Sequence, residues 1–194
     1  MSTPDALLIP DPSTSTSTST STSMLPEALR EPVGGVSLAA YLVVEASGLD
    51  GLPLPAVLAW LGLRGSVFER AEERWSERIA DELARDGSAL DGLYQDLVSR
   101  ALSLWARRIT PLDTDVEAWM TFQRHALASA DPGEHARKLG LTPGDELRLA
   151  RLWRERLLDP ETAARAVAAW SAPIQPLPRL TVAPLVFPPV VEPS

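Results

Sequence analysis

The stretch LGLTPGDELRLARLWRERLLDP, residues 139–160, decides the predicted fold. Its Leu-Gly pair is typical of a helix that ends at a glycine in the left-handed conformation. Thr142 stands three residues before Asp145, the spacing of a helix cap and a first-turn carboxylate, and Pro143 occupies the first helical position. The residues that follow are mostly Leu, Arg and Glu, which favour helix. The stretch therefore predicts a short helix, a tight turn and a long helix.

The same arrangement occurs 78 residues earlier in the chain. When residues 61–81 are aligned with residues 139–159 without a gap, eight of the 21 positions are identical. Both copies contain a Leu-Gly-Leu turn and, further along the long helix, a tryptophan. One such unit cannot bury both of its apolar faces. We therefore interpret the pattern as an internal duplication in which two related helical subdomains pack together.

Around these copies, residues 37–171 have the composition and periodicity of helices throughout, which predicts an all-α fold. We expect two subdomains, residues 37–110 and 111–171, with the large rings of Trp75, Trp105 and Trp153 as core anchors. The eight expected helices span residues 37–47, 54–61, 66–86, 88–109, 114–129, 131–139, 142–158 and 160–171.

The N-terminal part, residues 1–36, differs from this pattern. Serine and threonine alternate without a break from Ser13 to Ser23. Such a stretch has too little apolar surface to offset its ordering entropy, so we expect a disordered tail. Met24 follows the tract directly and is an alternative start of translation.

The C-terminal part, residues 172–194, contains seven prolines, which exclude a helix and predict an extended Pro-rich tail. It also carries many large apolar side chains, so the tail needs a surface on which to lie. That surface belongs either to a partner protein or to the chain's own helices. An extended apolar peptide can add to a partner's sheet edge or groove. In that case the expected contact residues are Leu180, Val182, Leu185, Val186 and Phe187.

The composition argues against several classes of function. The chain has no cysteine and two histidines, so we expect no disulfide, no metal site, no cofactor and no catalytic site. With 18 Lys and Arg against 26 Asp and Glu, its net charge is −8, which disfavours nucleic acid as a partner. No apolar run is long enough to span a membrane and no secretory signal is visible, so we expect a cytoplasmic protein.

One segment keeps a nucleic-acid interpretation open. Residues 131–157 can form a helix-turn-helix whose second helix bears four arginines. The local charge over residues 132–158 is only +2, and Trp153 stands among the arginines, where we expect it to face inward. A DNA-binding regulator is therefore kept as an alternative. The four arginines are Arg148, Arg151, Arg154 and Arg156.

The repeated pattern is a Leu-Gly-Leu turn, a capped helix with a central Trp and Glu-Arg, and a closing Asp or Asp-Pro. It resembles a helical repeat found in uncharacterised bacterial proteins encoded near type VI secretion components. The resemblance covers residues 54–86 and 131–171 and is best over Trp153–Arg156 and Asp159-Pro160. No activity is established for that group, so the resemblance implies a cellular neighbourhood and not a mechanism. Because the sequence offers no set of catalytic groups and its tail has a surplus of apolar residues, we expect a non-enzymatic adaptor or scaffold that binds another protein. The resemblance places it in a secretion or injection apparatus. A structural subunit or an immunity or inhibitor protein is the second alternative.

Overall fold

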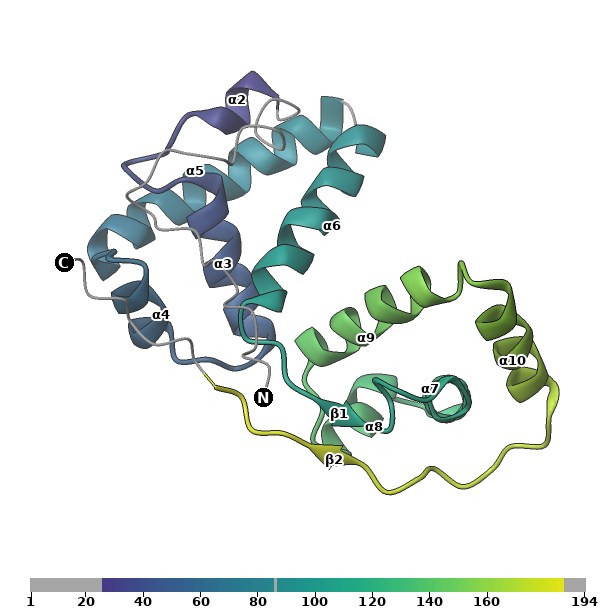
Figure 1. Cartoon of the computed structure of the whole chain (residues 1–194). Helices are drawn as coiled ribbons and strands as arrows, with labels where there is room; N and C mark the ends of the chain where they lie inside the picture. Colours follow the sequence, from purple (N-terminus) through teal and green to yellow (C-terminus); the bar gives the residue numbers. More distant parts are fainter. Residues whose placement is uncertain (1–25, 86, 187–194) are drawn as a thin grey trace, which may run out of the picture.

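The protein folds into helices that form two groups. The computed structural model describes residues 26–85 and 87–186. The first group contains α2 to α6 and the second α7 to α10, and Figure 1 shows α9 of the second group next to α6 of the first. The helices are α2 (Glu27–Arg30), α3 (Leu38–Leu49), α4 (Leu54–Trp60), α5 (Gly65–Arg85), α6 (Gly87–Ser103), α7 (Val116–Ala128), α8 (Pro132–Lys138), α9 (Pro143–Arg156) and α10 (Pro160–Ser171).

The all-α fold and the eight expected helices are confirmed, because α3 to α10 match them in order and nearly in length. Side-chain caps set the starts of the last three helices. Thr142 and Asp145 form a reciprocal capping box at the start of α9. Asp131 and Asp159 each accept a hydrogen bond from a first-turn N–H of the helix that they precede. Gly62 and Gly140 end the short helices with φ of 67° and 78°.

Two predicted boundaries are wrong. The helix expected over residues 88–109 ends at Ser103, and the chain instead forms a short strand, β1 (Ile109–Thr110). Ile109 and Thr110 are β-branched, and Thr110 precedes a proline, a position that disfavours helix. The folded part also begins before residue 37, because Leu29, Val33 and Val36 are buried in the first core. Residues 1–25 lie outside the described residues, and their predicted disorder stays a prediction.

Three apolar clusters hold the structure together. The first is built from α2 to α5 and contains Trp75, and the second is built from β1 and α7 to α10 and contains Trp153. The third lies where the two groups meet and contains Trp105 with Ala46, Ala101 and Leu102. All three tryptophans expected as core anchors are buried. The first two clusters divide close to the predicted subdomain boundary at residue 110.

The positions of the helices support the predicted duplication. Three successive helices in each group begin 78 residues apart: α3 at Leu38 and α7 at Val116, α4 at Leu54 and α8 at Pro132, and α5 at Gly65 and α9 at Pro143. The N-caps Ser37 and Asp115 are separated by the same offset, and each accepts a hydrogen bond from a backbone N–H of its helix. The two long helices then diverge, since α5 continues to Arg85 whereas α9 ends at Arg156.

The paired tryptophans make corresponding contacts. The indole Nε1 of Trp75 donates to the carbonyl of Val36 at 3.0 Å, and that of Trp153 donates to the carbonyl of Leu112 at 2.7 Å. Val36 lies just before α3, and Leu112 lies in the segment before α7. An arginine three residues later covers each ring, with guanidinium-to-centroid distances of 5.6 Å for Arg78 and 5.0 Å for Arg156. Trp75 therefore connects α5 to the segment before α3, and Trp153 connects α9 to the segment before α7.

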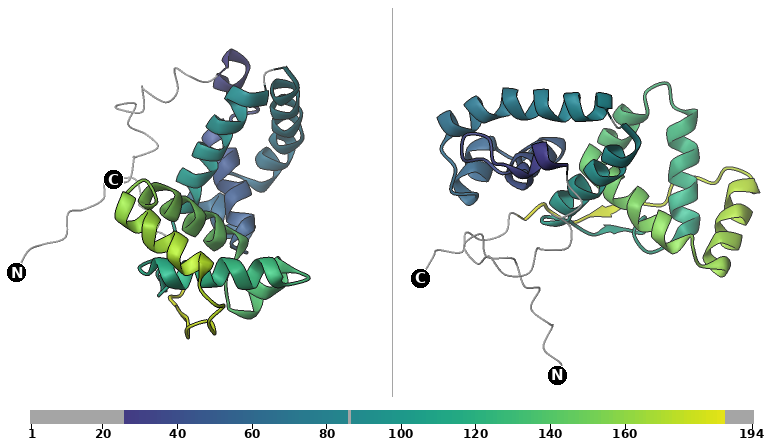
Figure 2. Two further views of the ribbon diagram at one scale, coloured as in Figure 1. Left: turned by 90° about the vertical axis from the view of Figure 1, so that its right-hand side faces the viewer. Right: turned by 90° about the horizontal axis from the view of Figure 1, so that it is seen from above.

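The C-terminal segment crosses the second group as an extended strap. It leaves the end of α10, runs below α7 in the view of Figure 1, and forms the strand β2 (Thr181–Val182) beside β1 (Figures 1 and 2). The two strands are antiparallel, with Ile109 opposite Val182 and Thr110 opposite Thr181. The described part of the tail is therefore extended, as its prolines predict, and belongs to the second group.

The tryptophan contacts can be tested by removing the indole N–H. We expect Trp75→Phe and Trp153→Phe each to lower the free energy of unfolding by about 2 kcal/mol, because a buried carbonyl loses its donor and the smaller ring leaves a void. Urea unfolding followed by circular dichroism measures the change. Trp170→Phe is the matched control, since Trp170 is 43% exposed and should be nearly neutral. A large effect at only one of the two buried positions would contradict their equivalence.

Candidate functional site

The residues expected to bind a partner through the tail are mostly used inside the molecule. Leu180 and Val182 pack against the second core, and Leu185 packs against the third. Val186 is 69% exposed, and Phe187 lies outside the described residues. Of the two surfaces left open by the sequence, the structure favours the chain's own helices. Leu180, Val182 and Leu185 are therefore partly covered by the chain's own cores, and their contact with a partner stays a prediction.

Backbone and side-chain hydrogen bonds fix the strap next to β2. The N–H of Ala183 donates to the carbonyl of Arg108 at 2.9 Å, which extends the strand pairing by one bond. The guanidinium of Arg107 donates to the carbonyl of Ala183 at 3.2 Å. Arg107 thereby connects the strap to a buried ionic network that the sequence did not predict.

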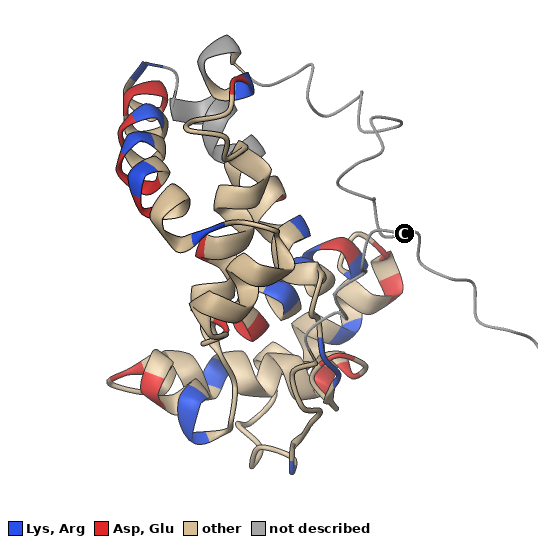
Figure 3. Ribbon diagram, turned by 90° about the vertical axis from the view of Figure 1, so that its left-hand side faces the viewer, with Lys and Arg blue, Asp and Glu red and all other residues tan. Residues whose placement is uncertain are grey.

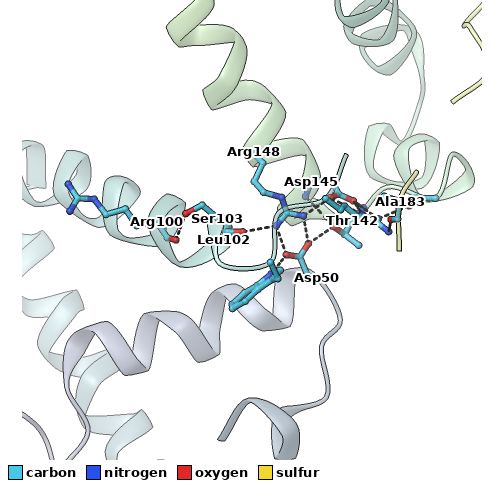
Figure 4. A network of polar contacts seen from close by, with 11 residues as sticks. Asp50, Arg100, Leu102, Ser103, Thr142, Asp145, Arg148 and Ala183 are labelled. Carbon is cyan, nitrogen blue, oxygen red and sulfur yellow. Dashed lines mark hydrogen bonds and ion pairs between the residues drawn. The ribbon is translucent and has the colours of Figure 1, made fainter. Parts of the chain in front are cut away.

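The network joins the two groups of helices through Asp50 and Arg148 (Figure 4). Asp50 follows the last residue of α3, and its carboxylate is fully buried. Arg148 of α9 donates to both carboxylate oxygens of Asp50, at 2.6 and 3.2 Å. The indole of Trp105 and the hydroxyl of Thr142 donate to the same carboxylate. Asp50 therefore receives donors from α9, from its N-cap and from the segment after α6.

Asp145 forms the second half of the network. Arg107 donates to both of its carboxylate oxygens, and Arg148 donates to Oδ1 at 2.5 Å. Arg107 also donates to the carbonyl of Gly140 at 2.9 Å, at the turn between α8 and α9. The result is a buried quartet of two carboxylates and two guanidinium groups with no net charge. We call Asp50, Arg107, Asp145 and Arg148 the ion quartet.

The arginines determine the protonation of the quartet. Burial alone would raise the pKa of Asp145, but hydrogen bonds from Arg107, from the N–H of Thr142 and from Arg148 outweigh burial and lower it. Burial alone would lower the pKa of Arg148, and its hydrogen bonds to Asp50 and Asp145 raise it instead. Both groups are therefore charged at neutral pH, and the pairs that they form are largely buried.

The start of α9 lies unusually close to Asp50. A Cβ atom at Gly144 would overlap the carboxylate of Asp50, so only glycine fits at this position. The last turn of α3 and the first turn of α9 are thus in direct contact. The two groups are consequently held in one relative orientation by the ion quartet and by this close approach.

Sequence reasoning identified part of this site. The spacing of Thr142 and Asp145 gave the capping box, and Arg148 was recognised as one of the repeated residues. Asp50 and Arg107 were missed, because each stands in a connection between helices and nothing in its local pattern indicates burial. The aligned residue of the first copy does not reveal the role of Arg148 either, because Arg70 is exposed and donates to the backbone of its own helix.

The arginines of the predicted helix-turn-helix are divided between several roles. Arg148 is held in the quartet, and Arg156 donates to the carbonyl of Asp113 at 2.6 Å. Arg151 forms ion pairs with Asp96 and Glu155, and Arg154 is exposed. The first half of α9 packs against α3 and α6. A recognition helix inserts the residues near its N-terminus into the major groove, and here that half is partly covered, since Gly144, Asp145 and Leu149 are buried.

The outer side of α10 presents apolar side chains to solvent. Val167 is 66% exposed, Trp170 is 43% exposed, and Ile174, just beyond the end of the helix, is 52% exposed. Residues three and four apart lie on the same side of a helix, so Ala163, Val167 and Trp170 form one stripe. We call Ala163, Val167, Trp170 and Ile174 the α10 face.

In residues 26–85 and 87–186, no helix is both long enough and apolar enough to cross a membrane. In the same residues, no group of three or more His, Asp or Glu side chains is arranged to hold a metal ion.

Comparison with known proteins found no match. No protein-family model, no curated protein and no solved structure is significantly similar to the chain.

The ion quartet makes a prediction for acid stability. We expect Asp145→Asn to lower the free energy of unfolding by about 3 kcal/mol, because it leaves buried guanidinium charge without its partner. Since the pKa of Asp145 is lowered in the folded state, its contribution is present above the unfolded-state value near 3.8 and is lost as pH falls below it. Urea unfolding as a function of pH measures both effects. Glu155→Gln is the control, because it breaks an exposed pair and should cost less than about 0.5 kcal/mol. Equal losses in the two variants would refute the prediction.

The strap makes a separate prediction. We expect Val182→Asp to lower the free energy of unfolding by about 2 kcal/mol, since it places a carboxylate against the second core. Val186→Asp makes the same chemical change at an exposed position of the same segment and should be neutral. Thermal unfolding of the two variants decides the matter: the strap would not belong to the core if both variants melted like the wild type.

Proposed function

We propose that the chain is a non-enzymatic adaptor or scaffold that binds another protein through the α10 face. The observation that carries the proposal is the exposed stripe of Val167, Trp170 and Ile174 on a helix held firmly by its neighbours. Exposed aromatic and aliphatic side chains that lie together are typical of protein-binding surfaces. The apolar tail, expected from the sequence to be the docking element, serves instead to brace the helices.

The chemistry of the α10 face indicates the kind of partner. No charged residue lies in the stripe, and the exposed residues beside it, Ala164, Ala168 and Ser171, are small and uncharged. The charged residue Arg165 is engaged by Glu117 of α7 through two hydrogen bonds, at 2.9 and 2.7 Å. Small side chains allow a second helix to approach closely, and Trp170 offers a large anchor. The proposed partner element is therefore an amphipathic helix whose apolar side carries no charge.

The α10 face is preorganised by its contacts with α7. Arg124 donates to the carbonyls of Ala169 and Ala172 at 3.3 and 2.6 Å, which fixes the end of α10. His125 Nε2 lies 2.9 Å from the carbonyl oxygen of Gln175 and holds the start of the strap. Hydrogen bonding to Arg165 also lowers the pKa of Glu117 to about 2, so this link between the helices is ionised at neutral pH. A surface fixed before binding loses less conformational entropy when a partner docks.

Other roles proposed from the sequence receive different support. The covered first half of α9 disfavours a DNA-binding regulator, which would need that half to be free. A structural subunit or an immunity or inhibitor protein would use the same α10 face, so it differs from an adaptor in its partner and not in its surface. We keep the cytoplasm as the proposed location and a secretion or injection apparatus as the proposed setting, the latter on the repeat resemblance alone.

The proposal is tested with a partner found by cross-linking in the native host and then purified. We expect Val167→Asp to weaken binding to that partner by at least about tenfold, because a carboxylate would be desolvated in an apolar contact. Isothermal titration calorimetry measures the affinity.

Leu158→Asp is the matched control, since Leu158 is also exposed but lies outside α10. It should leave the affinity unchanged. Binding that tolerates Val167→Asp and Trp170→Ala would exclude the α10 face, and a chain that purifies from its host with no bound protein would exclude the adaptor role.

A further inference from the structure

A second candidate surface is a cleft of about 660 Å³ at the junction of the two groups. It lies between the C-terminal half of α6, the connection that contains β1, and α9. Leu102, Ile109, Leu149 and Leu152 are among its lining residues and give it an apolar part. It is separate from the α10 face, and no residue of that face lines it.

The lining of this cleft is rich in arginine. Six of the chain's 18 basic residues line it, against two of its 26 acidic residues, Asp113 and Glu155. The molecule as a whole has a net charge of −8, and along α5 basic and acidic residues alternate, as Figure 3 shows. The charged side chains that line the cleft are therefore mostly basic, although the protein as a whole is acidic. We call it the arginine cleft, and its arginines are Arg100, Arg107, Arg108, Arg148, Arg151 and Arg156.

Three of the six arginines build the walls. Arg107 and Arg148 are held by the ion quartet, and Arg156 is held by the carbonyl of Asp113 and the ring of Trp153. Their positions are fixed by buried or backbone partners. They set the shape of the cleft, and the charges of Arg107 and Arg148 are balanced by Asp145 and Asp50.

The other three arginines can change partners at little cost. Arg108 is exposed and forms no ion pair or hydrogen bond through its side chain with the described residues. Arg151 shares its charge between Asp96 at 3.4 Å and Glu155 at 3.1 Å and is 39% exposed. Arg100 pairs with the same Asp96 at 2.8 Å and is more exposed still. Exposed pairs of this kind contribute little to stability, so a ligand with carboxylates can replace them.

We propose that the arginine cleft binds an acidic segment of a partner polypeptide, with carboxylates on Arg100, Arg108 and Arg151 and an apolar side chain on Leu152, which is the partly exposed leucine of the lining. The mixed lining favours such a segment over nucleic acid. Apolar residues and two carboxylates leave no continuous track for phosphates, and the surrounding acidic surface repels a long polyanion. The segment is a partner different from the apolar helix of the α10 face, and the two sites together would let the chain bridge two polypeptides.

The test uses a short fluorescein-labelled peptide of Glu, Leu and Ser, and fluorescence anisotropy with the full-length protein. We expect the peptide to bind at low salt, to weaken as salt rises, and to lose affinity when its Glu residues are replaced by Gln. Arg108→Ala and Arg151→Ala should each weaken binding about tenfold, the loss expected for one charge-assisted hydrogen bond. Arg154→Ala is the matched control, because Arg154 is exposed on the same helix but does not line the cleft.

Several results would overturn the proposal. They are equal loss of affinity in Arg154→Ala, unchanged binding of the Gln peptide, absence of binding at low salt, and stronger binding of inorganic phosphate or a labelled DNA duplex than of the acidic peptide. Val167→Asp should leave peptide binding unchanged, so the failure of this proposal and the failure of the α10 face are distinguishable. Thermal unfolding of each variant confirms that the arginine changes leave the fold intact.

Discussion

The buried contact between Asp50 and Arg148 sets the relation between the two halves of the molecule. A desolvated carboxylate is tolerated only when donors surround it, and Asp50 obtains them from α9, from the N-cap of α9 and from Trp105. Arg148 in turn needs Asp145, and Asp145 needs Arg107, which reaches the C-terminal strap. Loss of any one of the four side chains leaves the buried network with an uncompensated charge. The two helical groups, the turn before α9 and the strap are therefore coupled through four side chains.

The helices could be predicted because their determinants are local. Caps such as Thr142, left-handed glycines such as Gly140 and the stripe of apolar residues act within one or two turns, and the 78-residue offset places them twice. The end of α6 could not be predicted in this way. Residues 104–108 are compatible with helix, and it is the pairing of Ile109 with Val182, 73 positions later, that gives the chain a reason to be extended there. The N-terminal boundary failed similarly, because Leu29 and Val33 are buried by helices that come later in the chain.

The candidate sites show the same distinction between local and distant determinants. The tail was recognised as apolar, but whether it covers a partner or its own helices depends on what α7 to α10 leave exposed, and this is a property of the packed structure. The arginines of α9 were read as one basic surface. In the structure they separate because successive residues of a helix face different neighbours: Arg148 faces α3, Arg151 faces α6, and Arg156 lies on Trp153. Of the four arginines, only Arg154 keeps the solvent-facing role that the sequence pattern alone would give it.

The two proposed surfaces depend on the same internal constraint. The arginine cleft exists because α9 is held beside α6, and that placement comes from the ion quartet and from the close approach of Gly144 to Asp50. The α10 face follows from the strap, because a chain that braces α7 and β1 with its apolar residues leaves the outer side of α10 uncovered. One proposed surface lies at the junction of the two groups and the other lies on the second group, so both keep their shape and relative position only if the groups cannot rotate against each other. A buried, charge-balanced network meets this requirement better than apolar packing alone, because hydrogen bonds to two carboxylates specify direction as well as contact.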